Sequence, residues 1–80
     1  MTALNYIEKA YTRHARDVYR FLLSLSHDED LAEELTQETF FQAVGRIETF
    51  QGDSSIVTWL CGIAKNLWRS YLKKKVKEPE

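Results

Sequence analysis

The chain has 80 residues, with 11 Lys and Arg against 12 Asp and Glu, and a formal net charge of −1. Hydrophobic residues make up 44% and charged residues 29%, which is typical of one folded domain and too apolar for a disordered chain. No apolar run approaches the ~18 residues of a membrane span, the first residues are unlike a signal peptide, and one cysteine, Cys61, excludes an internal disulfide. These features indicate a cytoplasmic location. A domain of this size buries only about 60% of its unfolded surface, so we expect a thin core and no enclosed active site.

The charges divide the chain into an acidic part and a basic end. Residues 1–55 contain five basic and ten acidic side chains, whereas residues 56–80 contain six basic and two acidic ones. Between His27 and Glu38 there are six acids and no Lys or Arg, and between Lys65 and Lys77 there are six bases and no acid. Opposed patches of this kind indicate two different partners, one of them a polyanion, although two solvated helix faces would give the same pattern.

The spacing of apolar residues predicts an all-α fold, a compact bundle of three main helices. The first helix is expected from about Leu4 to Ser24. Its single stripe of apolar positions has spacings of three and four: Leu4, Ile7, Tyr11, Ala15, Val18, Leu22 and Leu25.

The second helix is expected to open at a capping box. Ser26 and Glu29 fit the S-x-x-E pattern, which predicts a helix that begins there and runs to about Ile47. One of two adjacent phenylalanines must face the core, and we expect it to be Phe40. The other apolar positions of this helix are Leu31, Leu35, Ala43, Val44 and Ile47.

The third helix has an apolar face and a basic face. Asp53, Ser54 or Ser55 can cap it, and it is expected to end near Lys75, with a loose tail or an interdomain linker over residues 76–80. Its apolar positions fall within an arc of about 100°: Ile56, Leu60, Ile63, Ala64, Leu67 and Tyr71. Asn66 and the basic residues lie on the opposite side: Lys65, Arg69, Lys73 and Lys77. Like charges at this spacing repel each other, so a helix that keeps them is suited to phosphates, with a solvated surface as the alternative.

The sequence does not favour an enzyme. His14 and His27 stand alone, without a nucleophile or an orienting group nearby in the sequence. The acidic segment lacks the D-x-D-x-D-G pattern of a calcium loop, and Cys61 fits an inert packing position on a helix. We therefore expect no catalytic residue, metal ion, cofactor or small-molecule substrate.

Several motifs then occur together in a known order. Asp30-Leu31-Ala32-Glu33-Glu34-Leu35-Thr36-Gln37-Glu38-Thr39-Phe40 is similar to the AEDLVQETF stretch of bacterial sigma factors. A second segment resembles their F-x-G-D…T-W-L-x-x-I-A-x-N-L…Y-L-R-K pattern, and Val18-Tyr19-Arg20-Phe21-Leu22 resembles the start of the same domain. The residues of the second segment are Phe50-Gln51-Gly52-Asp53-Ser54-Ser55, Thr58-Trp59-Leu60, Ile63-Ala64, Asn66-Leu67 and Tyr71-Leu72-Lys73-Lys74. Over residues 4–75 the chain thus resembles region 2 of the extracytoplasmic function (ECF) sigma factors.

The resemblance implies a transcription initiation domain with two binding roles. One role is docking on the clamp coiled coil of the β′ subunit of core RNA polymerase, carried by Glu33, Glu34, Leu35, Gln37, Glu38 and Phe41. The other is recognition and melting of the promoter minus-ten element by capture of its non-template single strand around a flipped base. That role falls on Gln51, Gly52, Asp53, Ser54, Ser55, Lys65, Asn66, Arg69 and Lys73. The family also implies an anti-sigma factor as a partner, and nothing indicates a homo-oligomer.

The chain departs from the family pattern at several positions. Cys61 and Gly62 replace an aromatic and a basic residue, Ser70 replaces Asp, and Lys73 replaces Arg. Family members also carry a second helix-turn-helix domain, so the chain is expected to be an isolated region 2. Trp59 is expected to pack between helices, and the role of Trp68 stays open.

Two other functions remain as alternatives. One is a helical protein-interaction module that never binds DNA. The other is a small helix-turn-helix regulator of duplex DNA, which the apolar start of the third helix, residues 56–60, argues against, because a recognition helix reads bases with that part.

Overall fold

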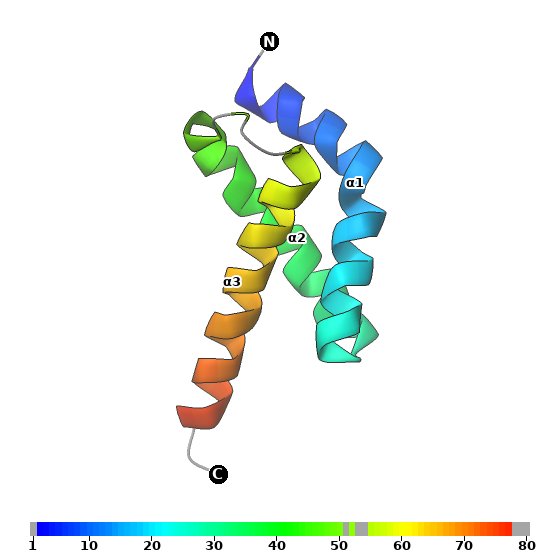
Figure 1. Cartoon of the computed structure of the whole chain (residues 1–80), viewed down its shortest axis with the longest axis vertical. Helices are drawn as coiled ribbons and strands as arrows, with labels where there is room; N and C mark the ends of the chain where they lie inside the picture. Colours follow the sequence, from blue (N-terminus) through cyan, green and yellow to red (C-terminus); the bar gives the residue numbers. More distant parts are fainter. Residues whose placement is uncertain (1, 51, 53–54, 78–80) are drawn as a thin grey trace.

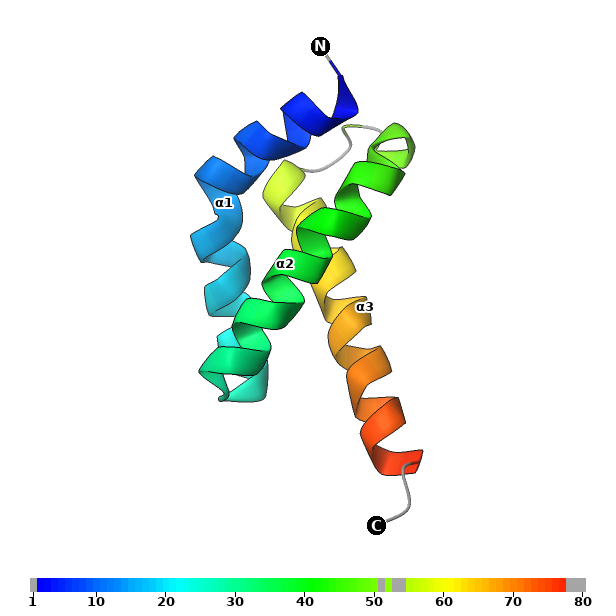
Figure 2. The same cartoon turned by 180° about the vertical axis from the view of Figure 1, so that it is seen from behind.

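The computed structural model describes residues 2–50, 52 and 55–77, and these form helices without any strand. The elements are α1 (Ala3–Ser26), α2 (Glu29–Arg46), the short 3₁₀ helix η1 (Ile47–Thr49) and α3 (Ile56–Lys77). Each of the three long helices packs against the other two, with α2 crossing α1 and α3 on one side of the molecule (Figures 1 and 2). The all-α fold expected from the sequence is confirmed.

Helix α1 begins and ends with defined caps. The Thr2 hydroxyl accepts a hydrogen bond from the Asn5 amide at 3.1 Å. At the other end His27 adopts the left-handed conformation, with φ 55°, and donates its amide hydrogen to the Leu23 carbonyl at 2.8 Å. His27 therefore closes the last turn of α1 and reverses the chain toward α2.

The residue that caps α2 is Asp28, so the predicted Ser26–Glu29 capping box is wrong. The Asp28 carboxylate accepts a hydrogen bond from the Leu31 amide at 3.1 Å. Ser26 is still the last residue of α1, and its hydroxyl accepts instead from the Asp28 amide at 3.2 Å. Because the apolar stripe of α1 continues to Leu25, the helix runs past the predicted end and the cap of α2 falls two residues later.

The core lies where the three helices cross. Small side chains at the crossings, Ala32, Ala43 and Ala64, have no exposed surface and let the helices approach closely. The remaining core residues fill the space around them: Ile7, Ala10, Val18, Leu22, Leu35, Phe40, Leu60 and Ile63. The hydroxyls of Thr36 and Thr39 are buried among these side chains and donate to the carbonyls of residues 32 and 35 at 2.7 Å each, so neither is left unpaired.

Two expectations about exposed aromatic and aliphatic residues have different outcomes. Phe40 is 5% exposed and Phe41 is 75% exposed, which confirms the choice of Phe40 as the core residue. Leu4 and Tyr11, however, were expected in the buried stripe of α1 and are 54% and 45% exposed. Tyr11 lies at the edge of the core, where its ring meets the edge of Phe40 with the two centroids 5.0 Å apart.

Helix α3 begins at Ile56, directly after Ser55, and continues beyond the other helices. The Ser55 hydroxyl accepts from the Thr58 amide at 3.2 Å, while Asp53 and Ser54, the other two predicted caps, lie outside the described residues. The helix includes Val76 and Lys77, two residues that were expected in the loose tail, and no Gly or Pro occurs between Gly62 and Pro79 to end it earlier. Its last turns project from the bundle and give the molecule a length of 47 Å against a width of about 21 Å (Figure 1).

No helix among the described residues is long and apolar enough to cross a membrane.

The first prediction compares two leucines of α3. Leu60 has no exposed surface and Leu72 is 41% exposed. Leu60→Ala should lower the free energy of unfolding by about 2–5 kcal/mol, since it leaves a cavity in the core, and Leu72→Ala by under about 1 kcal/mol. Urea unfolding followed by circular dichroism measures both, and equal losses would contradict the packing described here.

The second prediction concerns the start of α2. Asp28→Ala should lower the free energy of unfolding by about 0.5–2 kcal/mol, because the Leu31 amide loses its acceptor. Ser26→Ala, measured in the same way, should cost less, since Ser26 does not bond to the first turn of α2. A larger loss for Ser26→Ala would restore the capping box that the sequence indicated.

Candidate functional site

The acidic segment of the sequence forms the outer surface of α2. Glu29 and Asp30 occupy its first turn, where negative charge suits the positive end of the helix dipole. Five of the six residues predicted to bind the polymerase are exposed along the same helix: Glu33, Glu34, Gln37, Glu38 and Phe41. The sixth, Leu35, is 7% exposed and belongs to the core, so it holds the helix in place from inside.

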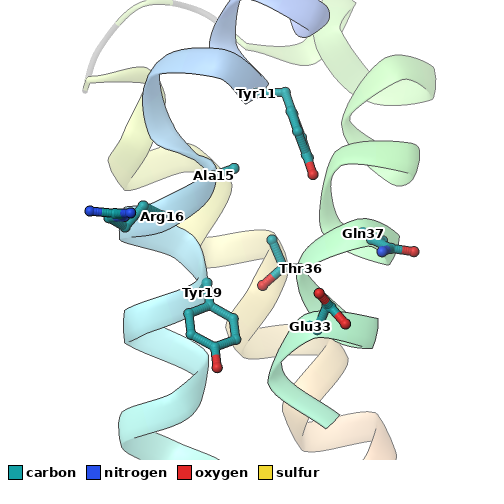
Figure 3. Close-up of a pocket in the computed structure, with 7 residues that line it drawn as sticks. All are labelled: Tyr11, Ala15, Arg16, Tyr19, Glu33, Thr36 and Gln37. Atoms are coloured by element: carbon teal, nitrogen blue, oxygen red, sulfur yellow. The ribbon is translucent and has the colours of Figure 1, made fainter. Parts of the chain in front are cut away.

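A groove runs between α1 and α2 beside this acidic surface. It has a volume of about 500 Å³, with Glu33, Thr36 and Gln37 on the side of α2. Figure 3 shows Tyr11 and Tyr19 on the side of α1 and Thr36 and Glu33 opposite them on α2, while the Gln37 side chain extends away from α1. Ala15 and Arg16 complete the lining, and the Arg16 side chain extends away from α2 (Figure 3).

Carboxylates gather beside the groove, toward the start of α2. Tyr19, Glu29, Asp30 and Glu33 line an adjoining hollow of about 170 Å³. Partial burial raises the pKa of the Tyr19 hydroxyl, and the three neighbouring carboxylates raise the pKa further, because each disfavours a phenolate. Among the residues that the structure describes, the one ion pair lies elsewhere, between His14 and Asp17 at 3.9 Å. The groove is therefore suited to a partner that brings positive charge.

The contribution of α1 to this groove was missed by the sequence analysis. Tyr11 was assigned to the buried stripe, and Tyr19 was noted only as part of a motif. The available signal was their spacing of eight residues, which places both rings on one face of a helix. Tyrosine, an aromatic ring with a polar end, is common at partly exposed contact surfaces. The spacing of Tyr11 and Tyr19 therefore indicated a position at the edge of the core.

The predicted DNA-binding residues of α3 form one exposed face. Lys65, Asn66, Arg69 and Lys73 are all exposed, and their spacings place them on the same side of the helix. No ion pair involves these three cations in the part of the chain that the structure describes.

The loop before α3 is described only in part. Gly52 is exposed and has a φ of 78°, a conformation that favours glycine. Ser55 is exposed at the start of the helix, where its hydroxyl lies 2.9 Å from that of Thr58. Three further predicted residues, Gln51, Asp53 and Ser54, lie outside the described residues.

The remaining residues singled out in the sequence have packing contacts. Trp59 packs on Phe50 with ring centroids 5.3 Å apart, as expected for a structural tryptophan. Trp68 stacks on Tyr71 at 5.8 Å, on the projecting part of α3. Cys61 is half-buried, and burial, with a smaller effect of Asp17, raises the pKa of its thiol and keeps it protonated.

The comparisons with known proteins agree with this arrangement. The family model of sigma-70 region 2 matches residues 10–78. The chain is 42% identical over 72 residues to the ECF RNA polymerase sigma factor SigM of Bacillus subtilis, covering 90% of this chain and 44% of that protein. It is 42% identical over 60 residues to the ECF RNA polymerase sigma factor EcfG of Rhodopseudomonas palustris, covering 75% and 33% of the two chains. With the ECF RNA polymerase sigma factor SigC of Mycobacterium tuberculosis it shares 43% identity over 58 residues, covering 72% and 31%.

The chain thus spans less than half the length of these relatives. A comparison with solved structures gives no match. The family match covers both the acidic α2 and the basic α3, in the order that the sequence motifs indicated. The chain belongs to the sigma-70 region 2 family, and the relatives that it matches are ECF sigma factors.

Proposed function

We propose that this chain is a transcription initiation module that binds core RNA polymerase and promoter DNA on two different faces. The α1–α2 groove and the exposed side of α2 dock on the clamp coiled coil of the β′ subunit. The exposed face of α3, together with the loop before it, captures the non-template strand of the minus-ten element around a flipped base. This is a binding role in the cytoplasm without a catalytic step, and an anti-sigma factor that covers either face would regulate it.

The observation that carries the proposal is the separation of opposite charges onto separate elements. Glu33 of α2 lines a groove of about 500 Å³ between two helices, a shape that accepts side chains from another helical protein. Glu29 and Asp30 line the hollow that adjoins it. The cations of α3 lie on a convex helix face, which suits a flexible polyanion better than a compact ligand. Neither set of charges is neutralised by the other in the described part of the chain.

Polymerase docking also has an apolar component. Phe41 is 75% exposed on α2, and it lines an apolar hollow of about 580 Å³ together with Leu4 and Val44. An exposed phenylalanine next to such a hollow is the kind of anchor that a protein partner covers. The acids then set the orientation and rate of docking, and Phe41 contributes buried area.

The DNA role assigns different tasks to neighbouring residues of α3. Lys65, Arg69 and Lys73 bind phosphates and give affinity without sequence information. The exposed amide of Asn66 both donates and accepts hydrogen bonds, so it is the residue of this face that can read a base edge. Capture of an extruded base and of the strand offsets the free energy of melting, so neither ATP nor a metal ion on this domain is required.

The third prediction tests docking on the polymerase. Glu33→Lys should weaken binding of the full chain to the isolated β′ clamp coiled coil by roughly tenfold, because it reverses the charge of the groove. Phe41→Ala should weaken it while leaving the unfolding midpoint within error, since the ring is mostly exposed already.

Glu48→Lys is the matched control for charge reversal, since Glu48 is an exposed acid outside the groove, in η1. A fluorescence titration measures all four proteins. Absence of binding by the folded wild type, or equal effects of the two charge reversals, would contradict the assignment of the groove.

The fourth prediction tests DNA binding. Binding to a labelled single-stranded oligonucleotide should fall with salt, and the double variant Lys65→Ala/Arg69→Ala should reduce the slope of log K against log [salt] by about 1.4, at about 0.7 per phosphate contact. Lys74→Ala/Lys75→Ala removes the same charge from other faces of the helix and should change the slope by less than half as much.

The outcomes of this titration separate the three candidate functions. Preference for the single strand over a duplex of the same sequence supports the proposal. Tighter duplex binding would favour a helix-turn-helix regulator, and equal slopes for wild type and both double variants would favour a pure protein-interaction module.

A further inference from the structure

The glycine in the middle of α3 has no structural explanation inside the molecule. Gly62 lies in the helix interior and is exposed. A Cβ atom built at this position meets nothing within 4 Å, so no neighbouring side chain or backbone requires the missing methyl group. Glycine nevertheless destabilises a helix relative to alanine, and no contact with the described part of the chain offsets that cost at position 62.

The position of Gly62 on the helix indicates what that is. Lys65 and Asn66 follow it by three and four residues, and Arg69 by seven, so all four lie on one face of α3. Thr58, one turn earlier, is also exposed on this face. Because Gly62 has no side chain, it leaves a shallow depression in the face that the proposed function assigns to DNA. The depression lies one turn before Lys65, the first cation, and Asn66, the candidate base-reading residue.

We propose that Gly62 is a contact point at which the sugar–phosphate backbone of the captured strand lies directly against the backbone of α3. A residue without a Cβ allows such close approach of a ligand. The backbone groups of a helix interior already bond to each other, so Gly62 itself offers no hydrogen bond that could read a base. The contact is one of shape with a deoxyribose, and the neighbouring Lys65 and Arg69 bind the flanking phosphates.

This inference rests on the proposed DNA-binding role and adds a steric element to it. The cations attract any polyanion. The depression at Gly62 determines how close the strand comes to the helix and which nucleotide lies beside Asn66. A side chain at position 62 would hold the strand away from the helix and leave the charges unchanged. Gly62 is in this sense a positioning residue for base recognition.

A second glycine, Gly45, provides a matched control. Gly45 of α2 is also helical and exposed, and a Cβ there also meets nothing within 4 Å. Gly62→Ala and Gly45→Ala should each raise the melting temperature of the chain by about 2–8 °C, since each removes the same helix penalty. Only Gly62→Ala should weaken binding of the labelled single-stranded oligonucleotide, by about tenfold, as overpacking at a close contact does.

Leucine at the same two positions extends the test. Gly62→Leu should weaken binding more than Gly62→Ala although leucine is a good helix former, and Gly45→Leu should leave DNA binding unchanged. At position 62 a substitution should therefore raise the melting temperature and weaken DNA binding. At position 45 it should raise the melting temperature and leave DNA binding unchanged.

The DNA-binding measurements on these variants test the close contact and the DNA-binding role separately. If the wild type binds the oligonucleotide through Lys65 and Arg69 and Gly62→Ala binds equally well, the close contact is wrong while the DNA-binding role stands. If the wild type does not bind single-stranded DNA, the proposed function fails and the inference fails with it. If Gly45→Ala weakens binding as much as Gly62→Ala, the effect is a general one of the stiffened helices, and the assignment of Gly62 is wrong.

Discussion

The crossing of three helices over a few small side chains is the constraint on which the rest of this molecule depends. Ala32, Ala43 and Ala64 are fully buried, and larger residues such as Leu22 and Leu60 close the space around them. A chain of 80 residues can bury only a small core, and its fully buried apolar side chains lie at or around this crossing. The charged residues are left on the outside, and the direction in which each helix leaves the crossing decides where they are presented.

The two charged faces also agree with the local physics of the helices that carry them. The acids of α2 begin in its first turn, at the positive end of the helix dipole, and Lys73, Lys74 and Lys75 lie toward the negative end of α3. The charges of each face therefore interact favourably with the dipole of their own helix, and they remain exposed to solvent. Such agreement between local preference and a binding role favours a single folded state over alternatives.

The sequence predicted burial correctly where the helical period alone determines which residues face the core. It predicted three helices, the buried Phe40 and the exposed Phe41, because adjacent residues of a helix point about 100° apart and only one of the two can face the core. It was less informative at helix ends, where Ser26 and Asp28 are both good caps and only the length of α1 selects between them. Leu35 illustrates a third case, since the motif that contains it combines exposed residues, which are predicted to contact the polymerase, with a residue of the core.

The α1–α2 groove was beyond the reach of the sequence for a different reason. Its lining joins residues about 20 positions apart, such as Tyr11 and Glu33, and their meeting depends on how the two helices cross. No single helical period contains that information. Gly62 shows the converse: the sequence marked it as a departure from a family pattern, and the structure was needed to show that no neighbour within the chain accounts for it.

The projecting part of α3 connects stability with binding. Few core residues support it, and it keeps Lys65, Arg69 and Lys73 at spacings of four, where like charges repel each other. The stack of Trp68 on Tyr71, and the Lys75 ammonium 5.7 Å from the Tyr71 ring centroid, stabilise its last turns locally. Phosphates bound along the cationic face would remove the repulsion, so a strand that binds there also stabilises the helix that holds it. A glycine and a row of cations each weaken the free helix slightly, and under the proposed function each cost would be offset when the strand is bound.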